Sequence, residues 1–216
     1  MDFNQFKQDF RKGVRPIVLT CDRLGLSPLS VSILGLAITA VSGLIIARGS
    51  LFWGALVFLV GSGFDMLDGD LARLQGTVSR QGAFLDSCFD RLGEAFLFAG
   101  LTWYYAGLPE DVAKLPLVLI TATVVGSLTT SYVRARAEGV GETCFVGLLQ
   151  RTERVIILTV GLLLGQWAML PVLGFLAIAT LGTTVQRIVH VAAKLPGPGE
   201  PQGDTVEPET HVEDSE

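Results

Sequence analysis

Four aspartates within 26 residues are the side chains of this chain best suited to do chemistry. They belong to the pattern Asp-x-x-Asp-Gly-x-x-Ala-Arg, eight residues, Gly-x-x-x-Asp-x-x-x-Asp, which is filled by Asp65, Asp68, Gly69, Ala72, Arg73, Gly82, Asp86 and Asp90. The aspartates lie at the ends of strongly apolar segments, where a carboxylate is costly unless it is paired, hydrated or bound to metal. We therefore interpret the cluster as a functional site.

The spacing of the aspartates predicts a divalent metal site. Asp65 and Asp68 are three residues apart, and Asp86 and Asp90 are four apart, so each pair shares one face of a helix. A short loop makes the two helices antiparallel, which lets the pairs face each other. Four carboxylates in a partly dry pocket repel one another unless cations intervene, and oxygen ligands favour Mg²⁺ or Mn²⁺. Two ions about 3.5–4 Å apart would suit phosphoryl transfer.

The other motif residues fit a bulky phosphorylated ligand. Gly69, Ala72 and Gly82 are small and let a ligand approach the backbone closely. Arg73 lies one helical turn beyond Gly69 and can contact a phosphate through two donors. Asp70 does not fall on the face that carries the motif, and we interpret it as a solvated acid at the membrane interface.

The elements that position these residues are expected to be membrane helices. Half of the 216 residues are hydrophobic and the mean hydropathy is +0.51, which is too apolar for a typical soluble domain. Uncharged stretches long enough to span a bilayer, or nearly so, cover residues 28–47, 51–64, 95–107, 115–133 and 155–186. The last is long for one span, and a turn marked by Gln166, Trp167 and Pro171 divides it. The prediction is an all-α membrane protein with six transmembrane helices.

Three regions follow from the composition. Residues 1–24 are predicted to form an amphipathic helix in the cytoplasmic membrane interface, because apolar side chains recur every three to four positions opposite basic ones. Residues 25–194 form the membrane domain. Residues 195–216 hold seven acids and no lysine or arginine, and are rich in proline and glycine, so a disordered tail is expected.

The basic residues predict the orientation in the cell membrane. With six spans, both termini lie on one side of the membrane. Arg48 and Lys114 are the only basic residues in the predicted loops of the opposite side. The excess of positive charge marks the cytoplasmic side of a membrane protein. Both termini and the aspartate site are therefore expected in or facing the cytoplasm, with no nucleic-acid partner.

The eight-position motif resembles the signature of the CDP-alcohol phosphotransferases. The resemblance implies an enzyme that binds a CDP-linked lipid, such as CDP-diacylglycerol or CDP-archaeol, and transfers its phosphatidyl-type group to an alcohol with release of CMP. It also implies a homodimer. By this resemblance the metal ligands are Asp65, Asp68, Asp86 and Asp90, with Asp90 also the general base, and the CDP-lipid pocket is lined by Gly69, Ala72, Arg73 and Gly82. A general base fits this reaction, because an alcohol is a weak nucleophile at neutral pH and attacks better when its proton is removed.

The acceptor is predicted from basic residues in the second half of the chain. The segments SYVRARAEG and QRTER are similar to those of the phosphatidylinositol-phosphate and archaetidylinositol-phosphate synthases of this family, which implies inositol 1-phosphate as the acceptor. Arginine stands at position 134, where that branch is expected to have lysine. The residues that could bind the acceptor phosphate are Ser131, Arg134, Arg136, Arg151, Arg154 and Arg187.

Three alternatives stay open on the sequence. Glycerol 3-phosphate is also an anionic acceptor and would make the chain a phosphatidylglycerophosphate synthase. A membrane transporter with a carboxylate cation site belongs to a different class, although the acids cluster at one membrane edge rather than at the midplane. A catalytically silent membrane scaffold is the third. The diacyl or diether nature of the donor and the choice between Mg²⁺ and Mn²⁺ are not encoded in the motif.

Overall fold

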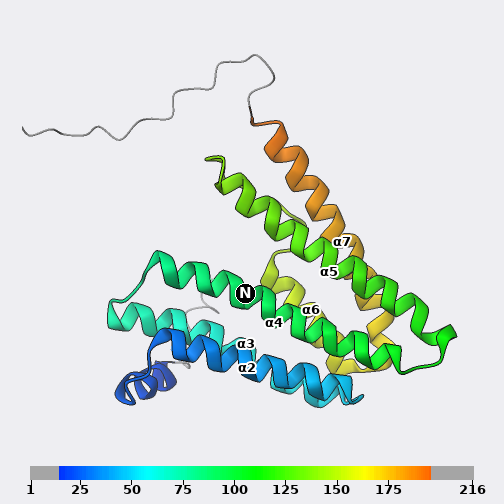
Figure 1. Cartoon of the computed structure of the whole chain (residues 1–216), viewed down its shortest axis with the longest axis horizontal. Coiled ribbons are helices and arrows are strands. Elements are labelled where there is room, and N and C mark those ends of the chain that lie inside the picture. Colours follow the sequence, from blue (N-terminus) through cyan, green and yellow to red (C-terminus); the bar gives the residue numbers. More distant parts are fainter. Residues whose placement is uncertain (1–14, 196–216) are drawn as a thin grey trace, which may run out of the picture.

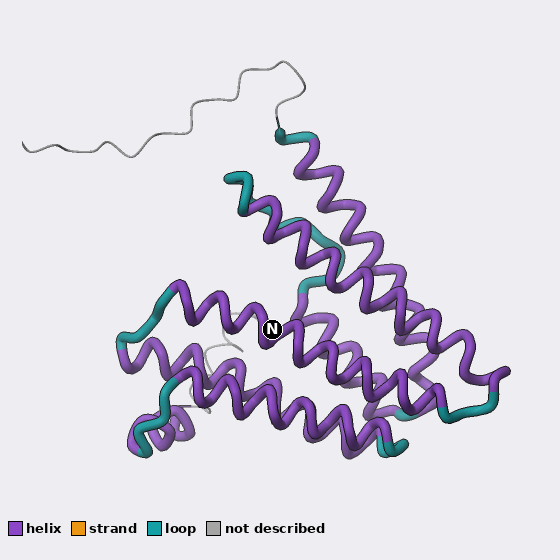
Figure 2. Tube along the Cα trace, viewed as in Figure 1, coloured by secondary structure: helices purple, strands orange, loops and turns teal. Residues whose placement is uncertain are grey.

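The computed structural model describes residues 15–195, and within that range its regular structure is entirely helical. Residues 15–23 are helical and precede six longer helices (Figures 1 and 2). These are α2 (Pro28–Ala47), α3 (Leu51–Gln75), α4 (Arg80–Ala106), α5 (Glu110–Glu138), α6 (Arg151–Leu164) and α7 (Gln166–Ala192). The all-α prediction is confirmed. The predictions for residues 1–14 and for the acidic tail beyond Leu195 lie outside the described residues.

Four of the helices are long and apolar enough to cross a membrane, namely α2, α3, α5 and α7. Helix α4 carries the second half of the aspartate motif, whose charged residues lower its hydropathy. Helix α6 has only 14 residues, which is short for a span. These features are those of a multi-pass membrane protein.

The break between the last two helices lies earlier than the sequence predicted. Gly165 separates α6 from α7 and has a φ of 80°, a left-handed conformation that glycine adopts without steric cost. Gln166 and Trp167 already belong to the first turn of α7, and Pro171 lies inside that helix. The two-helix prediction is confirmed, but the turn at Gln166, Trp167 and Pro171 is wrong, because the glycine rather than the proline ends the helix.

The helices form two arms. Helix α2 packs against both α3 and α4, and the three run alongside one another (Figure 1). Helices α5 and α7 pair closely and lean away from that group, so that their ends near residues 138 and 192 lie apart from the start of α4. Helix α6 contacts α3 and α7 and so joins the arms.

Small residues set the close contacts within each arm. A Cβ on Gly100 of α4 would lie 2.2 Å from the carbonyl oxygen of Gly43 in α2, and one on Gly61 of α3 would lie 2.5 Å from Thr39 Oγ1. In the other arm, a Cβ on Gly126 of α5 would lie 2.3 Å from Thr180 Oγ1. Small residues of this kind let helix backbones approach closely in membranes. In the first arm, they hold both motif helices, α3 and α4, close against α2.

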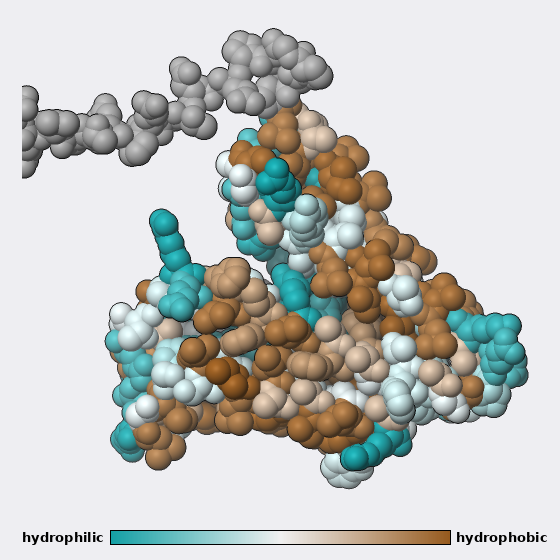
Figure 3. Space-filling model, viewed as in Figure 1, coloured by the Kyte–Doolittle hydropathy of each residue, from teal (hydrophilic) through white to brown (hydrophobic). Residues whose placement is uncertain are grey.

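The outer surface of the helices is largely apolar. Figure 3 shows hydrophobic side chains over most of both arms, with hydrophilic ones gathered at the ends and in the hollow between the arms. Trp103, Ile178 and Trp167 are 74%, 76% and 96% exposed. Contiguous apolar surface of this extent is costly in water and suits contact with lipid.

Candidate active site

Seven of the eight motif residues line one cavity between the ends of α2, α3 and α4. This cavity, which we call the donor cavity after the ligand expected from the motif, has a volume of about 710 Å³ and is bordered by Asp65, Asp68, Gly69, Ala72, Arg73, Gly82 and Asp86, among others. The loop from Gly76 to Ser79 makes the two motif helices antiparallel, as the sequence predicted. Gly76 ends α3 with a φ of 65°. The structure thus brings both halves of the motif together.

The donor cavity also receives two helix N-termini. Ser27 caps α2, with its Oγ accepting from the Ser30 amide at 3.2 Å, and Ser79 caps α4, with its Oγ accepting from the Gly82 amide at 3.1 Å. Ser27, Ser79 and Gly82 all line the cavity. Because the N-terminal end of a helix carries partial positive charge, both caps favour an anionic ligand here.

The aspartates of α3 meet protein partners around this cavity. Asp68 is buried and accepts a hydrogen bond from Ser32 Oγ of α2. Asp70 lies 2.5 Å from Arg73 through its Oδ1, so the acid that we had interpreted as solvated pairs with the motif arginine. On α4, Asp86 is exposed at the cavity wall.

Asp90 borders a second cavity of only about 20 Å³, mainly between α3, α4 and α6, which we call the acceptor cavity after the arginines expected to bind the acceptor. Arg151 Nη2 lies 2.6 Å from Asp90 Oδ1 and 3.1 Å from Asp65 Oδ2, so one guanidinium bridges the two acids. Arg154 and Glu94 line the same cavity. Asp65 borders both cavities and therefore marks their junction.

The donor atoms present fit a hard divalent cation. Asp65, Asp68 and Asp86 offer only carboxylate oxygens to the donor cavity, which suits Mg²⁺ or Mn²⁺. Asp90 Oδ1 is buried and has no hydrogen bond of good geometry, although Arg151 is near it. Among the described residues, no three acidic, histidine or cysteine side chains converge into a closed metal cluster. The four carboxylates therefore do not converge on one point, and Asp65 and Asp90 both contact Arg151 instead.

Two of the predicted acceptor residues line the cavity that Asp65 and Asp90 border, and one of them, Arg151, contacts both aspartates. Arg151 and Arg154 occupy the first turn of α6, whose start is fixed by a capping box between Gln150 and Glu153. Their guanidinium groups enter the acceptor cavity beside Asp90. Arg154 is buried, and its Nε has no hydrogen-bond partner.

Arg187 lines neither cavity, and its donors are already engaged. Its Nε donates to the carbonyl of Val146 and its Nη1 to the carbonyl of Thr130, both at 2.8 Å. The amides of Leu148 and Leu149 donate to Thr183 Oγ1 in the same region. Arg187 therefore ties the loop before α6 to α5 and α7.

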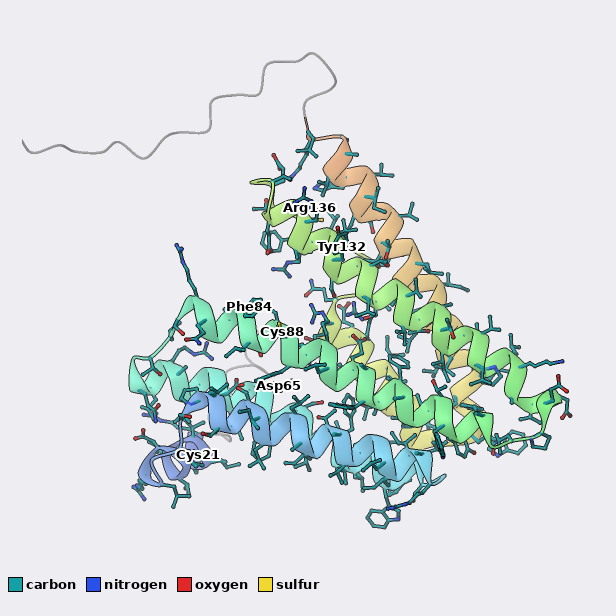
Figure 4. All side chains as sticks on the ribbon, viewed as in Figure 1. Cys21, Asp65, Phe84, Cys88, Tyr132 and Arg136 are labelled. Atoms are coloured by element: carbon teal, nitrogen blue, oxygen red, sulfur yellow. The ribbon has the colours of Figure 1, made fainter. Side chains whose placement is uncertain are left out.

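The remaining three predicted acceptor residues lie on α5 and line neither cavity. Arg134 pairs with Glu138 at 3.0 Å and lies over the ring of Phe145. The hydroxyl of Ser131 donates to the carbonyl of Ser127 in its own helix. Figure 4 shows Arg136 on the α5 arm, opposite the start of α4 and apart from Asp65.

Comparison with known proteins identifies the family. Residues 15–189 match the family model described as CDP-alcohol phosphatidyltransferase. The chain belongs to this family. It is 36% identical over 200 residues to the phosphatidylinositol phosphate synthase of Mycobacteroides abscessus, covering 88% of each chain. It is 35% identical over 198 residues to the archaetidylinositol phosphate synthase of Methanothermobacter thermautotrophicus, covering 89% of this chain and 95% of the relative.

Solved structures of a CDP-alcohol phosphatidyltransferase share the fold. The crystal structure of Mycobacterium tuberculosis phosphatidylinositol phosphate synthase with CDP-DAG bound has a TM-score of 0.78 and 34% sequence identity, and the match covers 88% of this chain and 98% of that one. The same enzyme in complex with manganese and citrate matches with a TM-score of 0.79 and 34% identity over 87% of this chain and 92% of that one.

In this CDP-alcohol phosphatidyltransferase, sequence reasoning missed three polar residues next to the motif. Ser32 contacts Asp68 from another helix, and nothing in the spacing of the sequence points to it. Glu94 and Arg91 follow Asp90 on α4. Glu94 is four residues past Asp90, the same interval that separates Asp86 from Asp90, so extending the i, i+4 pattern by one turn would have found it.

Proposed function

We propose that this enzyme transfers the phosphatidyl-type group of a CDP-linked lipid to a hydroxyl of inositol 1-phosphate and releases CMP. The observation that carries the proposal is the junction at Asp65, where a large cavity lined by the motif meets a small cavity lined by Asp90 and two arginines. The names of the relatives, and the CDP-DAG complex of the mycobacterial enzyme, support this choice of substrates.

The donor cavity is proposed to hold the CDP diphosphate. Gly69 and Gly82 leave room for it, the N-termini of α2 and α4 point partial positive charge at it, and Arg73 contributes a guanidinium. Asp65, Asp68, Asp86 and Asp90 would hold two divalent ions, Mg²⁺ or Mn²⁺. When bound, these ions offset the charge of the diphosphate and of departing CMP. The manganese complex of the mycobacterial enzyme supports the use of a divalent ion.

The phosphate and the attacking hydroxyl of inositol phosphate are proposed to bind at the mouth of the acceptor cavity, whose volume of about 20 Å³ is too small to enclose the whole molecule. Asp90 accepts the proton of the attacking hydroxyl, whose oxygen bonds to the lipid-side phosphorus while the bond from that phosphorus to the CMP oxygen breaks. Arg151 and Arg154 bind the acceptor phosphate and hold the hydroxyl in line. Ser131, Arg134, Arg136 and Arg187 stay predicted contributors, and their contacts in the structure make Arg151 and Arg154 the primary pair.

The membrane arrangement is part of the same proposal. The chain has six spans, with α4 and α6 completing the four apolar helices, and residues 1–24 lie in the cytoplasmic interface. Both termini and the two cavities face the cytoplasm, residues 195–216 form a disordered tail, and the enzyme works as a homodimer. Single cysteines at Arg48 and Arg80, in a variant without the native cysteines, test the orientation. Only the second should react with a thiol reagent applied from the cytoplasmic side.

The decisive experiment measures CMP release by the purified enzyme in detergent with CDP-diacylglycerol and Mg²⁺. The acceptors compared are inositol 1-phosphate, glycerol 3-phosphate, free inositol and serine. Release with inositol 1-phosphate alone is the expected result. Release with glycerol 3-phosphate alone would keep the catalytic aspartates and overturn the acceptor. A CDP-archaeol arm separates a diether donor from a diacyl one, and absence of release with either donor would overturn the transferase assignment.

A further inference from the structure

Glu94 and Arg154 form a buried pair one helical turn beyond Asp90, on the wall of the acceptor cavity. Glu94 Oε1 lies 3.7 Å from Arg154 Nε, and the two side chains are 14% and 6% exposed. The other carboxylate oxygen of Glu94 accepts a hydrogen bond from Ser127 Oγ at 2.7 Å. The carboxylate is therefore held from α5 on one side and faces α6 on the other.

The pair is loose on the side of the arginine. A separation of 3.7 Å is too long for a hydrogen bond, and Arg154 Nε is buried with no hydrogen-bond partner. Arg91, Arg151 and Arg187 are close enough to repel the charge of Arg154, and Glu94 is the acid that offsets it. A buried guanidinium that has an N–H donor without an acceptor, and that lies near further cations, attracts an anionic oxygen.

We propose that Glu94 is the counter-ion of Arg154 in the free enzyme, and that the phosphate of the bound acceptor replaces Glu94 as the partner of the Arg154 guanidinium. The inference rests on the proposed function for the identity of the acceptor, but its physics requires only a phosphate-type anion. Glu94 touches no reacting atom and is a positioning residue. It balances the charge of Arg154 between turnovers and competes with the bound phosphate for that charge.

The competition between Glu94 and the phosphate should speed release of the product. The acceptor phosphate is not consumed, because the hydroxyl rather than the phosphate of the acceptor forms the new bond, so the lipid product still carries it. Without a competitor, Arg154 would bind the phosphate of substrate and product more tightly alike, and the product would dissociate more slowly. The ion pair between Glu94 and Arg154 forms again as the product leaves.

The test measures phosphate binding by thermal shift, with inorganic phosphate and inositol 1-phosphate titrated at constant ionic strength. Glu94→Gln keeps the shape and the contact with Ser127 but removes the charge. We expect a lower melting temperature without anion and an apparent Kd for phosphate that falls about threefold to tenfold. The KM for the acceptor should fall with it, while the KM for the CDP-lipid stays unchanged. An unchanged or weakened phosphate affinity overturns the proposal.

Two further variants keep the test specific. Glu110→Gln removes the same charge from an exposed pair with Lys114 at the other end of α5, and should leave the phosphate affinity as in wild type. In Glu94→Gln combined with Arg154→Gln the tightening should vanish, and its persistence would place the anion elsewhere and refute the idea. If Glu94→Gln does not fold, Glu94→Asp withdraws the carboxylate by one methylene group and should tighten phosphate binding more weakly, whereas a rise in Kd contradicts the proposal.

The outcome separates this inference from the proposed function. CMP release with glycerol 3-phosphate alone would overturn the acceptor but leave the phosphate response of Glu94→Gln in place. Release with inositol 1-phosphate, together with an unaltered phosphate affinity in Glu94→Gln, would overturn the counter-ion role alone.

Discussion

Replacing Asp90 by asparagine tests the chemistry at the junction of the two cavities. The Asp90 side chain is 12% exposed and its Oδ1 lies 2.6 Å from Arg151 Nη2. Asparagine keeps the shape of the side chain but removes the charge that accepts a proton. Since a positioned general base contributes about 10²–10⁴-fold, we expect CMP release to fall by about 10³-fold. That loss corresponds to about 4 kcal/mol of transition-state stabilisation.

The structure also limits what else this substitution should change. Arg151 keeps Asp65 as a partner at 3.1 Å, so its charge is not left alone, and the fold and CDP-lipid binding should survive. The assay is the initial rate of CMP release with both substrates saturating, accompanied by a melting curve. Asp111→Asn, in the exposed first turn of α5, is the control for loss of one carboxylate. A variant at Asp90 that is folded and within about tenfold of the wild-type rate would refute the assignment of the base.

Three further predictions follow from other parts of the structure. Arg187→Ala should cost about 2–4 kcal/mol of stability, because it leaves the buried carbonyl of Thr130 and the part-buried carbonyl of Val146 without their donor. It should also raise the KM for the acceptor more than that for the donor, and equal changes in both would remove it from the acceptor side. Gly100→Ala should destabilise by about 1–3 kcal/mol and slow turnover, because its Cβ meets the backbone of Gly43, whereas Gly63→Ala, with open space around it, should melt like wild type. Chelation with EDTA should abolish CMP release and added Mg²⁺ or Mn²⁺ should restore it, and activity that survives EDTA would exclude a metal site at the aspartates.

The sequence predicted the donor side of the site well. The motif residues lie on two neighbouring helices joined by a short loop, and local periodicity alone brings Asp65, Asp68 and Asp86 to one cavity. The apolar stretch from residue 28 to residue 47 coincides with α2, since its proline start and its charge-free length mark both ends.

The acceptor side was predicted less well because it depends on contacts between distant segments. Six residues were expected to converge, but the chemistry of a side chain does not reveal its partners. Arg187 is buried and basic, as an anion-binding residue would be, yet two backbone carbonyls take up its donors. Arg151 reaches Asp65 because α6 packs against α3, a contact between residues 86 positions apart for which no local pattern exists.

Among the residues that border the two cavities, Asp65 is the one that they share. The walls are otherwise separate, so under the proposed function the residues that select the lipid and those that select the alcohol lie in different parts of the chain. Under that proposal, substitutions along α6 and at residues 89–94 of α4 should change the acceptor while the donor cavity stays intact. An enzyme with this arrangement could then exchange its headgroup by substitutions in one cavity and keep its way of activating the lipid in the other.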